Sequence, residues 1–253
     1  MTKFFSSEGL RAKNKMRDKD LLGQSFLDYQ AGKKYKAQIE RDDGHLDDHD
    51  IGQYFEDFDD FWEAEKKALR HAKGRVLDIG VGAGRTALYL QDKGLDVVGI
   101  DISDGALAVC EARGVRRLMK MSACDLKFRK NSFDTAIAFC NNFGLCGSIE
   151  GVQGMLARLH KIVQDDGVFL AESVHPTDTK KRAHLRYHKM NLARGKPPGQ
   201  VTLRLKYHGR KSAWFDLLMV RPEEMRELCR KTGWRVSKTC KGGPMRVYVL
   251  KKV

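Results

Sequence analysis

Between residues 75 and 173 the hydrophobic positions alternate between short continuous apolar runs and longer amphipathic segments. Five apolar runs predict buried strands, at 75–80, 95–101, 115–123, 133–140 and 167–173. Three amphipathic segments predict helices, at 84–94, 103–114 and 148–163. Continuous apolar strands that alternate with helices are typical of a parallel sheet with helices on both faces. The pattern therefore predicts an α/β fold.

The pattern changes after Ser173. Residues 201–220 predict a β-hairpin that turns near His208-Gly209. A last helix and two closing strands follow, at 221–233, 234–240 and 245–253. The closing strands are expected to join the sheet, so that the hairpin lies in an insert between the fifth and sixth strands. Residues 71–253 are thus expected to form one domain, with residues 175–220 as its insert.

Residues 1–70 predict a helical and acidic extension that covers the main domain as a lid. Residues 1–20 are basic and polar and predict a frayed arm or a loose helix, and residues 21–39 predict a short helix. Aromatic side chains recur at helical spacing within residues 40–65. They are Phe55, Phe58 and Trp62. This spacing predicts an amphipathic helix that packs its aromatic face on the main domain.

The chain is strongly basic, with 47 Lys and Arg against 33 Asp and Glu and a formal net charge of +14. The charge is unevenly spread. Residues 40–65 hold twelve acidic side chains against one arginine, a local charge of −11. Residues 175–211 hold eleven basic side chains against one aspartate, a local charge of +10. A basic surface indicates a polyanionic partner. Alternatively, the acidic segment neutralises the insert within the folded protein.

Other features of the composition exclude several classes. No run of eighteen apolar residues occurs, and the first twenty residues lack the apolar core of a signal peptide, so we expect a cytoplasmic protein without a membrane segment. We favour a monomer. Six cysteines occur without a C-x-x-C pair and are expected to be reduced, buried thiols. The cluster from His45 to Asp50 is interpreted as a solvated acidic loop, and no metal site is expected.

The first predicted strand ends in a glycine-rich turn, with Gly80, Gly82 and Gly84 in the spacing G-x-G-x-G and Asp78 just before them. Glycine lets a ligand approach the backbone, and the following helix offers free N–H groups. Asp101 ends the next strand, where a carboxylate reaches the hydroxyls of a ribose. Dinucleotide-binding proteins use G-x-G-x-x-G, and Asp78 would repel a pyrophosphate. The spacing therefore favours an adenosine cofactor that carries a sulfonium group.

Four segments carry a resemblance to a known family. They are VLDIGVGAG (76–84), VVGIDIS (97–103), MSACDLKF (121–128) and FDTAIAFCNNFG (133–144). With them the chain resembles the class I S-adenosylmethionine-dependent methyltransferases over residues 70–174 and, more weakly, over 221–253. The resemblance implies a Rossmann-like sheet of seven strands in the order 3-2-1-4-5-7-6, with the last strand antiparallel. It also implies S-adenosylmethionine as the cofactor.

The resemblance further implies which residues hold the cofactor. They are Asp78, Gly80, Gly82 and Gly84 at the methionine and ribose, Asp101 at the ribose hydroxyls, Ile102, Ser122 and Ala123 at the adenine, and Cys140 near the methyl group. The family often has an aspartate where Ser122 stands. The contact to the adenine amine therefore stays open, whereas the backbone contact from Ala123 does not depend on that side chain.

The fourth predicted strand ends in Cys140-Asn141-Asn142-Phe143, over which the resemblance implies that the methyl group points. This stretch is similar to the (D/N/S)-P-P-(Y/F/W) loop of enzymes that methylate amino groups of nucleic acids, although both prolines are missing. By that similarity Asn141 or Asn142 accepts hydrogen bonds from an amine, and Phe143 stacks on the base. Two alternatives stay open: the loop only walls the cofactor, or Cys140 is a nucleophile.

The insert lies where the family places substrate recognition. On the predicted hairpin, cationic side chains share one face and apolar side chains the other, which suits phosphates and unpaired bases. The predicted substrate-binding residues are Glu172, Lys180, Lys181, Arg182, Arg186, Tyr187, Arg204, Lys206 and Trp214. The first hypothesis is therefore an RNA methyltransferase that acts on a base amino group of ribosomal or transfer RNA. The rival is a small-molecule N- or O-methyltransferase with the acidic extension as lid.

Overall fold

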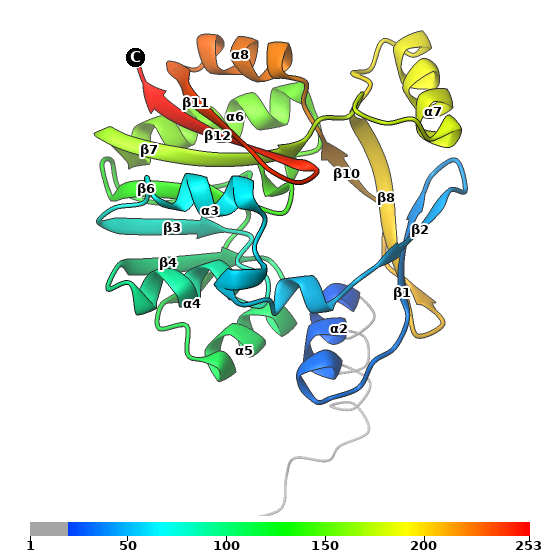
Figure 1. Cartoon of the computed structure of the whole chain (residues 1–253), viewed down its shortest axis with the longest axis horizontal. Helices are drawn as coiled ribbons and strands as arrows, with labels where there is room; N and C mark the ends of the chain where they lie inside the picture. Colours follow the sequence, from blue (N-terminus) through cyan, green and yellow to red (C-terminus); the bar gives the residue numbers. More distant parts are fainter. Residues whose placement is uncertain (1–19) are drawn as a thin grey trace, which may run out of the picture.

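The computed structural model describes residues 20–253, so the predicted arm over residues 1–20 lies almost entirely outside the described residues. Seven strands form the larger sheet, in the order β11-β12-β7-β6-β3-β4-β5 (Figure 1). They are β3 (Arg75–Ile79), β4 (Asp96–Asp101), β5 (Leu118–Lys120), β6 (Phe133–Ala138), β7 (Val163–Val174), β11 (Trp234–Lys241) and β12 (Met245–Lys252). Numbered along the chain and read from the β5 edge, the order is 3-2-1-4-5-7-6. Strand β12 runs antiparallel to both of its neighbours.

Helices cover both faces of this sheet, because successive side chains of its apolar strands point to opposite faces. Val76 belongs to one hydrophobic cluster, with side chains of α3, α4 and α5, and Leu77 to another, with side chains of α6 and α8. The helices are α3 (Glu63–Leu69), α4 (Arg85–Asp92), α5 (Asp104–Arg113), α6 (Ile149–Ile162) and α8 (Pro222–Lys231). The predicted α/β fold is confirmed. No helix formed by residues 20–253 is long and apolar enough to cross a membrane.

A second, smaller sheet joins the N-terminal segment to the insert, which also carries helix α7 (Arg182–Ala193). Its strands are β1 (Ala37–Arg41), β2 (Leu46–His49), β8 (Gln200–Tyr207), β9 (Arg210–Lys211) and β10 (Phe215–Leu218). The predicted hairpin is confirmed, since β8 and β9 meet at His208 and Gly209, with φ values of 47° and 75°. Positive φ at both turn residues matches the twist of a two-residue hairpin.

Helix α2 (Leu21–Gln30) attaches the smaller sheet to the main domain. Its Phe26 is completely buried in a cluster with Ala106 of α5 and Leu205 of β8. Helices α2 and α5 pack closely where two glycines meet. A Cβ on Gly105 would lie only 2.5 Å from the backbone of Gly23. The helix predicted over residues 21–39 is shorter than expected. It ends at Gln30, and residues 37–39 belong to β1.

The predicted amphipathic helix within residues 40–65 is wrong. This segment holds the β1–β2 hairpin, two short 3-10 helices (Gly52–Tyr54 and Phe58–Asp60) and the beginning of α3. The aromatic side chains still pack on the main domain, where Phe58 stacks on Tyr89 with ring centroids 4.0 Å apart. Local spacing did not indicate a strand, because β1 is stabilised by pairing with β8 about 160 residues later in the chain.

Candidate functional site

The glycine-rich turn connects β3 to α4 and has the geometry that only glycine adopts readily. Gly80, Gly82 and Gly84 have φ values of 70°, 58° and 87°. A Cβ on Gly80 would lie 2.4 Å from Nδ2 of Asn142. That amide donates hydrogen bonds to the carbonyl oxygens of Ile79 and Gly80, at 3.0 and 2.8 Å. The turn is therefore held open and fixed from the loop after β6.

Asp78 lies in β3 directly beneath this turn and is 4% exposed. Burial raises the pKa of its carboxyl to about 7. Among residues 20–253, its Oδ2 has no hydrogen-bond partner. A buried carboxylate oxygen without a partner is costly unless a ligand supplies one. The residues present therefore fit the amino group of a methionine moiety at this point.

Asp101 ends β4 beside the same turn. Its Oδ2 accepts a hydrogen bond from the Gly82 amide at 3.1 Å, and its Oδ1 accepts one from the Ser103 amide at 3.0 Å. The neighbouring Ile102 is 68% exposed, which is unusual for a large aliphatic side chain at the end of a buried strand. This pair provides a polar group and an apolar surface side by side, as a ribose with its base requires.

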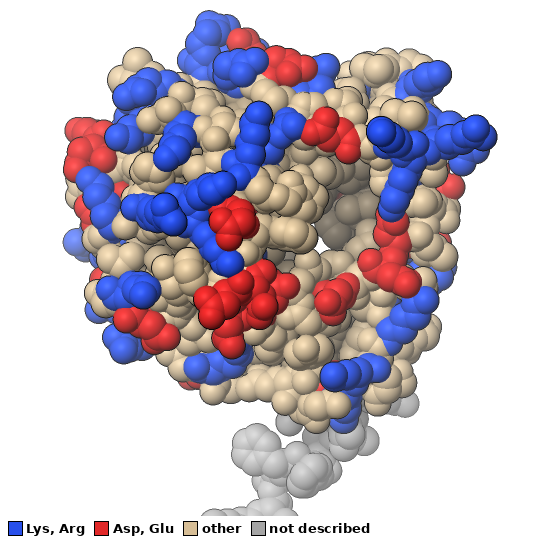
Figure 2. Space-filling model, in the orientation of Figure 1, with Lys and Arg blue, Asp and Glu red and all other residues tan. Residues whose placement is uncertain are grey.

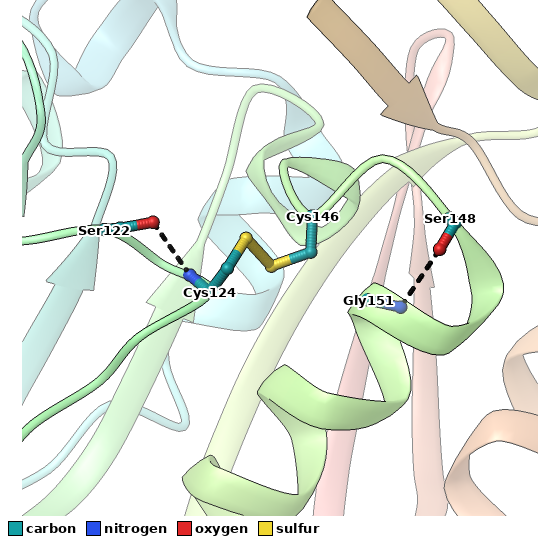
Figure 3. The surroundings of a disulfide bond; sticks show 5 residues. All are labelled: Ser122, Cys124, Cys146, Ser148 and Gly151. Carbon is teal, nitrogen blue, oxygen red and sulfur yellow. Dashed lines mark hydrogen bonds between the residues drawn. A yellow bond between two sulfur atoms is a disulfide. The ribbon is translucent and has the colours of Figure 1, made fainter.

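A disulfide fixes the segment predicted to meet the adenine edge. Cys124 and Cys146 are bonded, with their Cα atoms 5.6 Å apart (Figure 3). Cys124 follows Ser122 and Ala123, and its amide donates to Oγ of Ser122 at 3.2 Å. The prediction of reduced thiols is thus wrong for these two cysteines, which lie 22 residues apart in the sequence and meet only in the fold. The other four cysteines are free.

The loop after β6 begins with two consecutive residues in the left-handed region, Cys140 (φ 54°) and Asn141 (φ 63°). Such backbone is strained for residues with a side chain and needs support. Glu172 of β7 gives that support, because its Oε2 accepts a hydrogen bond from the Cys140 amide. Oδ1 of Asn141 accepts one from the Val174 amide at 2.7 Å. Glu172 is 1% exposed, and burial raises its pKa to about 8.

These contacts do not suit the roles predicted for the loop. Asn142 holds the glycine turn, Asn141 holds β7, and Glu172 faces inward rather than toward a substrate. Phe143 is completely buried, near Phe169 with ring centroids 6.2 Å apart. The stacking role predicted for Phe143 is therefore wrong, because its ring belongs to the core.

Sequence reasoning missed a buried ion pair behind this loop. Arg85, in the first turn of α4, pairs with Glu65 of α3, and both are at least 92% buried. The same guanidinium lies 3.2 Å from Sγ of Cys140 and 4.2 Å from the Phe61 ring centroid. Burial raises the pKa of Cys140 to about 12, so the thiol is neutral at pH 7 and does not suit the nucleophile alternative. In the sequence, the only indication of this ion pair was that a charged residue, Arg85, directly follows Gly84.

The N-terminal segment packs on the glycine turn. A Cβ on Gly82 would lie 3.4 Å from the Tyr54 ring, and Phe26 packs beside Tyr54 with centroids 4.8 Å apart. The Tyr54 hydroxyl and Nε2 of His49 are 3.1 Å apart, and burial lowers the pKa of His49. Arg113 binds the segment with a hydrogen bond to the Phe55 carbonyl at 3.3 Å. His49 and Tyr54 were not predicted as site residues, because nothing local marks them.

Acidic residues of the N-terminal segment neutralise part of the basic insert. Arg204 pairs with Glu40 at 2.8 Å, and Lys181 pairs with Asp47 at 3.3 Å. Tyr187 is 3% exposed and donates its hydroxyl to an aspartate of the same segment, so it cannot stack on a base as predicted. The Arg204 guanidinium lies 4.2 Å from the ring centroid of Trp214. Three predicted cations are exposed on or beside α7. They are Lys180, Arg182 and Arg186.

The surface reflects this pairing. In Figure 2 basic and acidic side chains lie close together over the face that is shown, and the surface is hollowed between β12 and β8. A cavity of about 350 Å³ opens at the carboxyl end of β7. It is lined by Val174, His175, Asp178, Lys241, Gly243, Pro244, Met245 and Arg246. Because Asn141 bonds to Val174, this cavity adjoins the loop after β6.

Comparisons with known proteins match the part of the chain that holds the glycine turn. A family model described as a methyltransferase domain matches residues 77–171. The ubiquinone/menaquinone biosynthesis C-methyltransferase of Citrifermentans bemidjiense is 30% identical over 125 residues, which is 45% of this chain and 52% of that protein. The glycine/sarcosine N-methyltransferase of Parasynechococcus marenigrum is 27% identical over 146 residues, which is 49% of this chain and 52% of that protein. The chain thus spans about half the length of these relatives.

A solved structure covers more of the chain. The S-adenosylmethionine-dependent methyltransferase from Bacteroides fragilis, determined in complex with S-adenosyl-L-homocysteine, superposes with a TM-score of 0.79. It covers 93% of this chain and 96% of its own, at 24% sequence identity. The likeness extends over the smaller sheet as well as the larger one, so both parts belong to a fold that occurs elsewhere.

Proposed function

Since residues 77–171 form a class I S-adenosylmethionine-dependent methyltransferase domain, we propose that the protein transfers a methyl group from that cofactor to a nitrogen or oxygen of a small molecule. One observation carries the choice of a small acceptor. The N-terminal segment lies directly on the glycine turn, with Tyr54 against Gly82. An acceptor has to fit beneath this cover, as a small molecule does more readily than a base of a polymer.

The cavity beside Val174 supports the same proposal. Its volume of about 350 Å³ lies in the range of small-molecule sites. Arg246 and Lys241 among its lining residues favour an acceptor that carries an anionic group, although Arg246 already pairs with Asp178. The names of two relatives also refer to small molecules, one as a C-methyltransferase of ubiquinone and menaquinone biosynthesis and the other as an N-methyltransferase of glycine and sarcosine.

Several residues of the chain would each have a separate role in the methyl transfer. Asp78 would hold the amino group of the cofactor, and Asp101 its ribose hydroxyls. Glu172 would keep the loop after β6 in its strained conformation. The cofactor supplies an electrophilic methyl group on a sulfonium sulfur. The Tyr54–His49 pair would receive the proton that leaves the acceptor, since a neutral imidazole at 3.1 Å can accept it through the phenol.

RNA remains the second candidate because of one observation. Lys180, Arg182 and Arg186 are exposed on or beside α7, where they could contact phosphates. The remaining predicted contacts favour this candidate less, since Arg204 and Lys181 are already paired with carboxylates.

Transfer of a labelled methyl group decides between the two candidates. The protein is incubated with methyl-labelled S-adenosylmethionine and either a small-molecule filtrate of a cell extract or purified total RNA. We expect label in the filtrate and none in RNA, whereas label in RNA alone would show that the acceptor is a polymer. Asp101→Ala serves as the variant that cannot hold the cofactor and should transfer no label to either.

A separate measurement of turnover tests the role of the Tyr54–His49 pair. Tyr54→Phe should retain binding of S-adenosylhomocysteine but lower the turnover number about a hundredfold, in the range of a lost general base. His71→Gln, which changes a histidine outside the site, should leave turnover unchanged. Equal turnover of Tyr54→Phe and wild type would rule out the pair as proton acceptor without affecting the assignment of the cofactor.

A further inference from the structure

Two histidines and an aspartate meet where the N-terminal segment contacts the insert. His45 and Asp47 come from the β1–β2 hairpin, and His184 comes from α7. Nε2 of His45 and Nε2 of His184 lie 3.2 and 3.8 Å from Oδ2 of Asp47. The three ligand atoms all lie within 4.8 Å of one another. All three residues are half-buried. The predicted solvated loop from His45 to Asp50 is corrected in one respect, because residues 46–49 form strand β2, whereas Asp48 and Asp50 are exposed.

The orientation of the two imidazoles resembles that of metal ligands. Nε2 of His45 is covered and, although it is close to Asp47, makes no hydrogen bond with any residue from 20 to 253. Nε2 of His45 and the carboxylate of Asp47 therefore converge without a hydrogen bond between them. Nδ1 of His184 lies 3.2 Å from Oγ1 of Thr179, which leaves Nε2 to face Asp47. Metal-binding histidines commonly have such a partner on the second ring nitrogen.

The chemistry of these ligands selects the ion. Two imidazole nitrogens and one carboxylate oxygen suit Zn²⁺, with water in the fourth position. Tetrahedral bonds of about 2.0 Å place ligand atoms about 3.3 Å apart, so distances of up to 4.8 Å between the ligand atoms need changes of at most about 1.5 Å.

We propose that His45, Asp47 and His184 bind one Zn²⁺ ion that fastens the β1–β2 hairpin to α7. Such an ion lies outside the cofactor site and takes no part in the transfer. Its role is to hold the N-terminal cover in place on the insert. Lys181 weakens the binding of Zn²⁺ at this site. Its ammonium group pairs with Oδ1 of Asp47 at 3.3 Å and repels a cation.

Binding of Zn²⁺ alone tests this site without any reference to methyl transfer. The full chain is freed of metal with a chelator and titrated with Zn²⁺ against a chromogenic chelator. We expect one ion per chain for the wild type and at least tenfold weaker binding for His184→Gln. His71→Gln removes one histidine elsewhere and should bind as the wild type does. Lys181→Met should bind several-fold more tightly.

Thermal unfolding gives a second readout that separates loss of the site from loss of the fold. Zn²⁺ should raise the midpoint of the wild type and leave that of His184→Gln unchanged, while both apo proteins have the same circular dichroism. If His184→Gln is misfolded, Asp47→Asn replaces it in both measurements. Absence of Zn²⁺ binding at micromolar concentrations, or equal binding by the wild type and the folded ligand variant, overturns the proposal.

Discussion

At the scale of single residues, burial of the Asp78 carboxyl lowers the stability of the free protein at neutral pH. An aspartate with an ordinary pKa of 3.8 ionises in the unfolded chain, whereas the buried group stays protonated up to about pH 7. The unfolded state then binds fewer protons, so stability falls as the pH rises through this window. The site residue therefore destabilises the free protein at neutral pH.

Asp78→Asn should remove this penalty. We expect the variant to gain stability over the wild type as the pH rises from about 4 to 8, by up to about 4 kcal/mol for a difference of three pKa units. Urea unfolding at several pH values measures the gain. Binding of S-adenosylhomocysteine should weaken in the same variant. Asp104→Asn, an exposed neighbour paired with Lys120, should show neither effect.

Arg85 is the residue whose loss should be most damaging. Arg85→Met leaves the carboxylate of Glu65 buried without its counter-ion, and breaking a buried pair typically costs about 3–5 kcal/mol. Urea unfolding should show this loss, and the double variant Arg85→Met with Glu65→Gln should recover most of it. Arg230→Met, which breaks an exposed pair with Glu227, is the matched control and should unfold like the wild type. An equal effect of both arginine variants would contradict the role assigned to burial.

At the scale of elements, the disulfide ties the segment after β5 to the loop before α6 (Figure 3). It closes a loop of 22 residues, which corresponds to about 3 kcal/mol of stability through the restricted unfolded chain. A reductant should lower the unfolding free energy of the wild type by about this amount and weaken binding of S-adenosylhomocysteine, because Ser122 and Ala123 lose their anchor. The double variant Cys124→Ser with Cys146→Ser should behave like the reduced wild type and ignore the reductant.

The elements that the sequence predicted are those with strong local signals. Buried strands such as β3 and β4 and glycine-terminated helices such as α5 carry their own apolar runs and caps, and the resemblance to the methyltransferase family rested on them. The candidate cofactor residues Asp78 and Asp101 could be predicted because they lie at or near the ends of these strands. Strand β1, the disulfide and the Glu65–Arg85 pair depend on partners far away in the chain, which no local pattern specifies. Phe143 was misplaced because a short motif does not reveal which way a side chain points.

At the scale of the whole molecule, the acidic segment and the basic insert form one sheet in which opposite charges are paired. The local charge of +10 that the insert has when it is counted alone therefore overstates the cationic surface that it offers to a polyanion. Glu40 alone contacts both Arg204 and Lys211. Removing its charge should release two cations without changing the fold.

Glu40→Gln should consequently bind single-stranded RNA more tightly than the wild type does. The dependence of log affinity on log salt concentration should steepen by at most about 1.4, the value for two additional phosphate contacts on a single strand. A filter-binding titration at several salt concentrations measures this slope. Glu63→Gln, on the surface of α3 and away from the smaller sheet, is the control. An unchanged slope in Glu40→Gln would mean that these cations do not reach phosphates.

The pairing of β1 with β8 also has a consequence for folding during synthesis. Strand β1 leaves the ribosome early, yet its partner Leu205 is made only after the five parallel strands of the larger sheet. During that interval Ile39 and its neighbours have no strand beside them except β2. The nascent chain therefore carries an open sheet edge through most of its synthesis, and the smaller sheet can be completed only after the strands β3 to β7 of the larger sheet have been made.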